Sequence, residues 1–421
     1  FEKAINFRLV NYFENNDLFH NKQFGFRKKF STGSALTQFT NEIIEALDES
    51  QDAAGVFCDL SKAFDCVDHS VLLSKLNDYG LKGSCISLLK SYLTERKQRT
   101  VILKNNTRHF SDWKEVSIGV PQGSVLGPIF FIFFLIFIND LPKAIDKELI
   151  LFADDTTAVV KRKTSFELHT SLTDTLKDME RWFTENGLKL NLDKTKIIKF
   201  SLRKKDESFT FPNQIESHTF LGVKFEENLS WKVHLDYIHR KIRSVSFVFL
   251  HLRDCVPFET VKIVYHAYVE SILRYGIVLW GQASEIRSVF RLQKRIIRIM
   301  TNSHPRSSCK TLFRNLNIQT IIGLYIFESL TYIHSIKNYL PHTLMFQHSY
   351  NTRNRSCFRL PSHHLTSYEK SPLYVGLKLY NELPILYKSM TLVNFKEKLK
   401  SELLIKSFYS LQEYFDNPLT N

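Results

Sequence analysis

The 421-residue sequence has few cysteines, and nothing in their spacing indicates a metal site or a disulfide framework. The six cysteines are scattered along the chain, and no two of them form a C-x₂-C pair. The common zinc-binding patterns are therefore excluded, and a reducing compartment is expected.

Long hydrophobic runs are also missing. The longest run, Ile129–Ile138, is far shorter than the roughly twenty apolar residues that a membrane-spanning helix needs. We therefore expect a buried core helix there, not a membrane anchor. The chain starts at Phe1 without an initiator methionine or a signal peptide, so we expect it to be part of a longer product.

Acidic residues are in deficit, with 43 Asp and Glu against 57 Lys and Arg, a net charge of +14. Residues 231–310 hold fourteen Lys or Arg but only five Asp or Glu. This clustering favours a phosphate-binding surface over a uniformly solvated one, and it points to nucleic acid or a membrane surface as partner. Basic and aromatic residues alternate there, as suits a groove that follows a nucleic-acid backbone, although a membrane-surface helix shares the pattern.

Two adjacent carboxylates, Asp154 and Asp155, stand between apolar, β-prone runs in residues 150–160. The pattern predicts a short hairpin with both acids at its tip. Neighbouring side chains on a regular strand point to opposite faces, but at a tight turn both can face one hollow, which suits Mg²⁺. Asp-Asp is also simply a good turn former, so the pair alone does not decide.

Three further stretches carry candidate chemistry. A buried strand predicted at 53–60 ends in Asp59, a carboxylate that needs a partner, a helix cap or a metal. The turn Pro121–Gly123 introduces an apolar helix at 125–138, and its Gln122 can offer both a donor and an acceptor. The basic loop around Arg27 precedes a helix that Ser31 and Ser34 can cap, and it is either a triphosphate contact or a solvated turn.

The remaining elements follow from hydrophobic periodicity and turn residues. We predict helices at 1–20, 70–79, 84–94, 165–186, 319–337 and 391–405, a strand at 197–201 and a strand or hairpin at 220–225. We also predict a hairpin of 98–103 with 113–118 around the turn Lys104–Thr107.

In combination, these motifs resemble the reverse transcriptase of non-LTR (LINE-type) retrotransposons, close to the jockey-like branch. The set consists of the strand-end Asp59 with Phe64 after it, the Pro-Gln-Gly turn, the Asp-Asp hairpin, the Lys194 loop and the Phe-Leu-Gly strand. The resemblance implies an α+β fold: a right-hand polymerase with fingers and an antiparallel palm sheet, a helical thumb and a mostly helical C-terminal region. Residues 1–225 would be fingers and palm without the first fingers segment, 226–310 a basic helical thumb, and 311–421 a region of unknown role.

The same resemblance implies the site residues. Asp59, Asp154 and Asp155 would be catalytic and would bind two Mg²⁺ ions, or Mn²⁺, with Asp155 more peripheral. The implied nucleotide-binding residues are Ala63, Phe64, Gln122, Phe152, Ala153, Arg27 and Lys194, among which Phe64 would be the steric gate against a ribose 2′-hydroxyl. Phe220, Leu221, Gly222 and Val223 would form the primer grip.

The implied function is an RNA-directed DNA polymerase that extends a DNA primer on an RNA template with dNTPs. Its partners would be the element RNA in a ribonucleoprotein and the DNA target, with nuclear integration after cytoplasmic assembly, no membrane and no secretion. The oligomeric state stays open. A catalytically inactive, decayed RNA-binding protein is the alternative, and Phe64 disfavours an RNA-dependent RNA polymerase.

The sequence departs from the family pattern in one place. Residues 129–137 contain about three residues more than the pattern expects between Pro128 and Ile138. Three residues turn a helix by about 300°. The insertion is therefore expected either to bulge out or to rotate Gln122 relative to Asp154.

Overall fold

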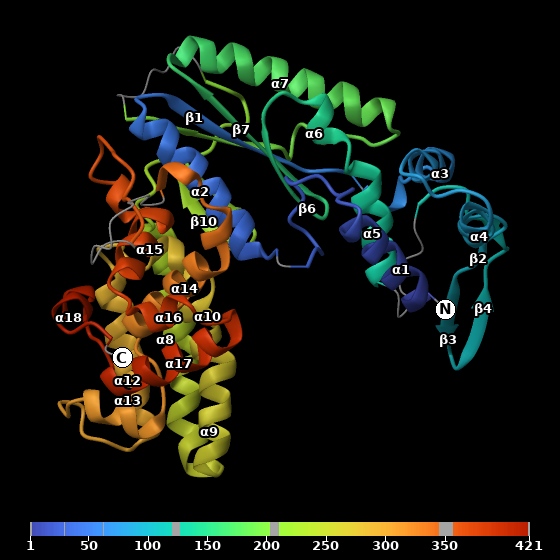
Figure 1. The fold of residues 1–421 in the computed structure, drawn as a ribbon. Coiled ribbons are helices and arrows are strands. Elements are labelled where there is room, and N and C mark those ends of the chain that lie inside the picture. Colours follow the sequence, from blue (N-terminus) through green and yellow to red (C-terminus); the bar gives the residue numbers. More distant parts are fainter. Residues whose placement is uncertain are drawn as a thin grey trace. The chain divides into compact units, whose positions relative to one another are not determined.

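The computed structural model describes residues 2–28, 30–61, 63–119, 127–202, 210–344 and 357–419 (Figure 1). They form two compact units, Phe1–Phe39 with Gln51–Glu216, and Thr40–Ser50 with Ser217–Asn421. Helix α2 (Thr32–Asp48) contributes its beginning to the first unit and its end to the second. The fold is α+β and the sheets of the described residues are antiparallel, which confirms the predicted fold class.

The first unit contains seven helices with α2 included, one 3₁₀ turn and eight strands among the described residues. The helices are α1 (Glu2–Asn15), α2, α3 (His69–Asp78), α4 (Ser84–Leu93), α5 (Gly127–Ile138), α6 (Leu141–Ala144) and α7 (Ser165–Glu185), and the 3₁₀ turn is η1 (Ala63–Asp65). The strands are β1 (Asp52–Cys58), β2 (Lys97–Gln98), β3 (Val101–Lys104), β4 (Thr107–Phe110), β5 (Lys114–Glu115), β6 (Glu148–Phe152), β7 (Asp155–Arg162) and β8 (Lys196–Phe200).

A four-stranded sheet in the order β6-β7-β1-β8 is the framework of this unit. Every residue of β1 is buried, because helices cover both faces of this small, apolar strand. On one face the Phe39 ring of α2 lies so close that a Cβ on Gly55 would be 2.8 Å from it. On the opposite face the Cys58 sulfur lies 4.0 Å from the Met179 sulfur of α7. The strand predicted at 53–60 is confirmed.

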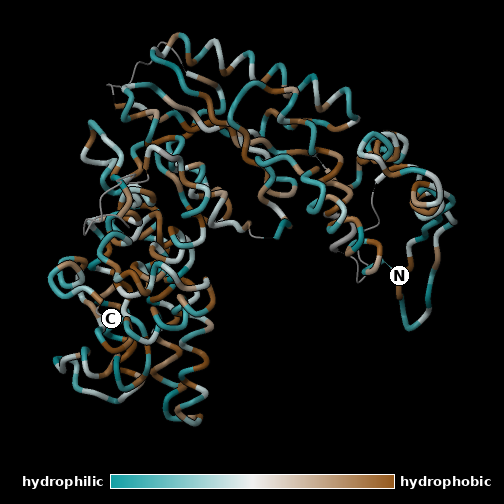
Figure 2. The backbone as a smooth tube through the Cα atoms, in the orientation of Figure 1, coloured by the Kyte–Doolittle hydropathy of each residue, from teal (hydrophilic) through white to brown (hydrophobic). Residues whose placement is uncertain are grey.

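Helix α7 is amphipathic, and it runs along the sheet (Figure 1). Thr164 caps its start by accepting the backbone N–H of Glu167, and Leu168, Leu172 and Phe183 are buried. Hydrophilic and hydrophobic residues alternate along it in Figure 2, as expected of a helix with one face on a sheet. Gly187, with φ 72°, takes the left-handed conformation that follows the end of the helix.

The turn predicted at Lys104–Thr107 is confirmed, but the predicted pairing of 98–103 with 113–118 holds only where Gln98 lies opposite Lys114. Strand β3 instead pairs with β4 around a two-residue turn, Asn105-Asn106, and β2 pairs with β5. Both asparagines have positive φ, 50° and 59°, as a tight hairpin turn of this kind requires. The two-residue turn brings Thr107–Phe110 back onto Val101–Lys104, so Val101–Leu103 pair with these residues and not with 113–118.

Helix α5 is a core helix, as the sequence predicted. It runs without interruption from Gly127 to Ile138, and residues 132–138 are all buried. The extra residues therefore form no bulge within α5, while a rotation of Gln122 concerns a residue outside the described ranges. Of the helices in the described ranges, none is long and apolar enough to cross a membrane.

The second unit is mostly helical. It contains the β-hairpin β9 (Ser217–Phe220) and β10 (Val223–Glu226), then α8 (Lys232–Cys255), α9 (Phe258–Tyr265), the π-helical turn η2 (His266–Glu270), α10 (Ser271–Arg274), α11 (Ile277–Trp280), α12 (Ile286–Met300), α13 (Lys310–Leu316) and α14 (Ile321–Ile336). It continues with η3 (Lys337–Tyr339), η4 (His342–Leu344), η5 (Tyr368–Lys370), α15 (Pro372–Asn381), α16 (Ile385–Lys388), α17 (Leu392–Lys406) and α18 (Leu411–Asp416).

Helix α14 is the centre of this unit, because it is buried on nearly every side and packs against α10, α11, α15 and α17. The basic helix α12 packs against α8 and buries Val289, Ile296 and Met300, while Arg291 and Arg295 are exposed. The helices predicted at 319–337 and 391–405 and the hairpin predicted at 220–225 are confirmed.

Candidate active site

The hairpin predicted at residues 150–160 is confirmed. Strands β6 and β7 pair with Phe152 opposite Asp155, so Ala153 and Asp154 form a two-residue turn. Ala153 has φ 56°, a left-handed conformation that costs an alanine about 1 kcal/mol or more. Such strain persists only where the surrounding structure enforces it. The turn leaves Asp154 and Asp155 exposed at the tip.

Strand β1 brings Asp59 to the same end of the sheet. In the β1–β7 pairing Cys58 lies opposite Thr156, so the next residue, Asp59, emerges beside Asp155. The Asp59 backbone carbonyl accepts the N–H of Asn191 at 2.9 Å, which fixes the main chain, while its side chain is 45% exposed. Three carboxylates thus come from two neighbouring strands.

The pKa of Asp155 is affected by the two neighbouring carboxylates. Burial by the surrounding protein, followed by the charges of Asp154 and Asp59, raises the pKa of Asp155 from 3.8 to about 6. Asp155 is nevertheless exposed at the surface, so solvent screens part of this repulsion. The raised pKa of Asp155 therefore combines loss of hydration, the larger cause, with repulsion from the two neighbouring carboxylates.

The Lys194 loop lies directly against Asp59. Residues 188–195 are joined to the end of β1 by a bridge between Leu60 and Leu190 and by a hydrogen bond from Ser61 N–H to the Lys189 carbonyl, 3.0 Å. The Lys194 ammonium lies 3.9 Å from an Asp59 oxygen, and its side chain is 70% exposed. The structure therefore brings together two of the predicted site residues that are 135 positions apart in the sequence.

The donor chemistry of this sheet end fits a divalent cation. Carboxylate oxygens are the ligands that Mg²⁺ prefers, and a cation would relieve the repulsion that raises the pKa of Asp155. Within the described ranges, no group of three or more His, Cys, Asp and Glu side chains lies close enough to hold a metal ion. Binding by all three carboxylates therefore requires their exposed side chains to change rotamer.

The predicted gate residue Phe64 follows Asp59 on the short 3₁₀ turn η1. Its ring is half-buried and packs on Phe134 of α5, with ring centroids 4.9 Å apart. Ala63 beside it is buried. The ring is therefore held by the core on one side, which suits a fixed steric barrier.

Phe152 and Ala153 belong to the turn itself. Ala153 is buried, Phe152 is half-buried, and the Phe152 ring lies 6.4 Å from that of Phe26. Phe26 is 52% exposed and has φ 54°. The role of Phe152 and Ala153 as the floor of the nucleotide site stays a prediction.

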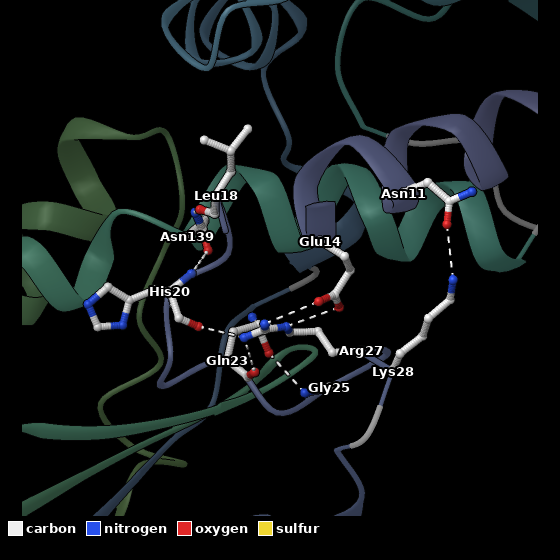
Figure 3. A network of polar contacts seen from close by, with 9 residues as sticks. All are labelled: Asn11, Glu14, Leu18, His20, Gln23, Gly25, Arg27, Lys28 and Asn139. Carbon is white, nitrogen blue, oxygen red and sulfur yellow. Dashed lines mark hydrogen bonds and ion pairs between the residues drawn. The ribbon is translucent and has the colours of Figure 1, made fainter. Parts of the chain in front are cut away.

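Arg27 is engaged within the protein (Figure 3). Its Nε and Nη2 donate to the two carboxylate oxygens of Glu14, both at 3.3 Å, and Nη1 donates to the carbonyls of His20 and Gln23 at 3.0 and 3.3 Å. Its side chain is only 10% exposed. The predicted triphosphate contact of Arg27 is not tested by these bonds, but the guanidinium already has internal partners.

The predicted primer grip forms the turn of the β9–β10 hairpin in the second unit. Leu221 and Gly222 have φ 43° and 78° and occupy the turn, while Phe220 and Val223 are buried. The Tyr275 hydroxyl donates to the Leu221 carbonyl at 2.6 Å. Gln122, predicted to touch the nucleotide or template, lies outside the described residues.

The family model described as reverse transcriptase (RNA-dependent DNA polymerase) matches residues 1–225. The chain belongs to this family. It is 29% identical over 342 residues to a probable RNA-directed DNA polymerase from transposon BS of Drosophila melanogaster, covering 76% of this chain and 37% of that protein. It is 25% identical over 315 residues to the RNA-directed DNA polymerase from mobile element jockey of the same species, covering 70% and 33%. The resemblance to polymerases of non-LTR retrotransposons is confirmed.

The reverse transcriptase chain spans little more than a third of the length of these relatives. Among solved structures, it is similar to a telomerase from Candida albicans in complex with a fragment of telomeric RNA. That match has 10% identity and a TM-score of 0.43, and it covers 97% of this chain and 59% of that one. A TM-score below 0.5 does not by itself establish a shared fold.

Sequence reasoning missed one residue at the Asp154 turn and one at the predicted primer grip. Gly25 lies against the Asp154 turn, since a Cβ on it would be 2.5 Å from the Ala153 nitrogen. Its only signal in the sequence was its place between two phenylalanines, Phe24 and Phe26. Tyr275, which holds the Leu221 turn, gave no local signal at all.

Proposed function

We propose that this chain is the polymerase core of an RNA-directed DNA polymerase that extends a DNA primer on an RNA template. The observation that carries the proposal is the meeting of Asp59 with Asp154 and Asp155 at one end of an antiparallel sheet, in a chain of the reverse transcriptase family. In-line phosphoryl transfer needs mainly positioning and neutralisation of charge. The end of the sheet at which β1 and β7 lie side by side would provide the positioning.

Asp59 and Asp154 would hold two Mg²⁺ ions, with Asp155 more peripheral. Such ions would supply activation of the primer 3′-hydroxyl and neutralisation of the leaving pyrophosphate. Lys194 pairs with Asp59 in this structure, and we propose that its mobile ammonium turns to the triphosphate when the carboxylates bind metal.

The remaining residues would select the substrate. Phe64, fixed against Phe134, would exclude a ribose 2′-hydroxyl and so favour dNTPs. Ala63, Phe152 and Ala153 would line the nucleotide site, and Gln122 would contact the incoming nucleotide or the template base.

We propose the wider organisation on the family likeness and on charge. Residues 1–225 would be fingers and palm, and 226–310 a thumb that holds an RNA–DNA hybrid by its phosphates. The thumb includes the exposed Arg291 and Arg295 of α12. The role of 311–421 is open. The protein would act in the nucleus after cytoplasmic assembly with its element RNA.

Primer extension on an RNA template with Mg²⁺ tests the proposal. We expect dNTP incorporation by the wild-type chain and a loss of at least about 100-fold with Asp154→Asn, because the turn loses a metal ligand. Asp78→Asn, at an exposed carboxylate at the end of α3, is the matched control and should keep wild-type activity. Hybrid binding without incorporation by the wild type would instead support the inactive RNA-binding protein.

A further inference from the structure

The segment Lys22–Arg27, called the brace segment below, lies along the outer edge of strand β6. The Leu151 N–H donates to the Lys22 carbonyl at 3.0 Å, and the Phe24 N–H donates to the Leu151 carbonyl at 2.8 Å. The Lys22 ammonium also pairs with Glu148 of β6. The brace segment is therefore joined by its backbone to the strand that leads into the Asp154 turn.

Gly25 packs directly against the main chain of the Asp154 turn. A Cβ at Gly25 would lie 2.5 Å from the Ala153 nitrogen and 3.1 Å from the Phe152 carbonyl carbon. Both atoms are main chain and belong to a tight turn, so neither can move aside by a rotamer change. The Gly25 N–H donates to Oε1 of the fully buried Gln23 at 3.0 Å, which fixes the local path of the segment. The left-handed conformation of Ala153 thus forms directly against this glycine.

Two side chains hold the main chain that leads into the brace segment (Figure 3). Arg27 binds the carbonyls of His20 and Gln23 and is itself held by Glu14 of α1. The side chain of Asn139 accepts the His20 N–H and donates to the Leu18 carbonyl, both at 2.8 Å. The brace segment is therefore joined to β6 by its backbone and to Glu14 of α1 by Arg27, while Asn139 fixes the residues just before it.

We propose that the brace segment fixes the position of the Asp154–Asp155 turn relative to Asp59, with Gly25 and Arg27 as positioning residues. The expected effect on catalysis rests on the proposed polymerase function. The expected effect on the structure of the turn does not, and it is called the structural arm below. Arg27 acts through the main chain of the segment and not by touching the triphosphate. Glu14 is then as necessary as Arg27, because it is the anchor of the guanidinium.

The first test compares Gly25→Ala with Gly33→Ala in the full chain. Gly33 lies in α2 with only the Ser31 hydroxyl near its Cβ position, at 3.4 Å, so its substitution is the matched control. We expect Gly25→Ala to lower kcat about 10-fold or more at unchanged KM for dNTP, since small misplacements of reacting groups are costly. Hydrogen exchange at the Leu151 and Phe24 amides should become at least tenfold faster. Gly33→Ala should change neither quantity.

The second test separates positioning from triphosphate binding. Arg27→Ala and Glu14→Ala should lower kcat together and leave KM for dNTP unchanged, with the milder Arg27→Lys between them and the wild type. A raised KM in Arg27→Ala with wild-type kinetics in Glu14→Ala would overturn the proposal in favour of a triphosphate contact.

The exchange measurement needs no catalysis. If the wild-type chain were inactive, the polymerase proposal would fail. The exchange rates of the Leu151 and Phe24 amides would still show whether Gly25 holds the brace segment against β6. Wild-type exchange at both amides in Gly25→Ala would refute the structural arm. Thermal unfolding of each variant shows whether it is still folded. If Arg27→Ala does not fold, Arg27→Lys is compared with the wild type in its place.

Discussion

At the scale of single residues, the Asp155 carboxyl stands where its charge is disfavoured. Its pKa is raised to about 6 by burial and by the charges of Asp154 and Asp59. A cation bound between these residues would remove the repulsion, so the folded chain without metal should be less stable near neutral pH than an otherwise equal chain that lacks this charge.

We expect Asp155→Asn to raise the melting temperature at about pH 7.5 in EDTA and to change it little near pH 4. Between the ordinary pKa of 3.8 and the folded pKa of about 6, the folded state binds more protons than the unfolded state. The free energy of unfolding of the wild type therefore falls as pH rises through this window, whereas asparagine has no proton to lose. Thermal unfolding at both pH values checks this. Asp78→Asn is the control, and equal shifts at both pH values would contradict the argument.

At the scale of elements, the β9–β10 hairpin depends on His234 of α8. The Lys224 N–H donates to Nδ1 of His234 at 3.2 Å, and the buried ring lies 5.8 Å from that of Trp280. Burial and then the Lys224 charge lower the pKa of His234 from 6.5 to about 4. The imidazole is therefore neutral, and Nδ1 is its unprotonated nitrogen.

Acidification should destabilise this junction. The unfolded state binds the proton more strongly between about pH 6.5 and pH 4, so stability is lost as the pH falls through that window. From about pH 7 to pH 5 the loss should be about 2 kcal/mol. His234→Gln should reduce this pH dependence in denaturant unfolding, and His251→Gln, at an exposed histidine, should leave it unchanged. Equal pH slopes in the wild type and His234→Gln would rule out His234 as the source.

The elements also show what the sequence can predict. The Asp-Asp hairpin, β1 with Asp59 at its end, and α7 between Thr164 and Gly187 were predictable, because local periodicity and turn residues encode them. The β3–β4 turn was predictable too, but the strand pairing was not, because Asn105-Asn106 lacks the Asn-Gly signature of a two-residue hairpin turn. The contact of Gly25 with Ala153 joins positions far apart in the sequence, so no local sequence pattern predicts it.

At the scale of the whole molecule, packing in the second unit crosses the predicted boundary at residue 310. The Tyr325 ring of α14 lies directly over Gly281, where a Cβ would be 2.1 Å from it. Arg274 of α10 forms an ion pair with Glu328 of α14 at 3.0 Å. Residues on the two sides of this boundary therefore share one core.

A chain that ends at Lys310 should lose the ordered packing of its remaining second-unit helices. Removal of α14 uncovers the apolar surfaces of α10 and α11, including the buried Leu273 and Trp280. We expect increased binding of a hydrophobic dye and loss of the part of the tryptophan near-ultraviolet circular dichroism signal that Trp231 and Trp280 contribute. Cooperative unfolding with the native near-ultraviolet signal would show instead that residues 217–310 fold without the C-terminal region.

Helix α2 sets an order of events during synthesis. Its last residue, Asp48, accepts the backbone N–H groups of His364 and Leu365 at 2.9 and 2.8 Å, across 316 and 317 residues of sequence. The ribosome has to release more than three hundred further residues before these partners of Asp48 emerge. Until then the second half of α2 lacks its final contacts, so a nascent or prematurely terminated chain exposes this helix to chaperones and proteases.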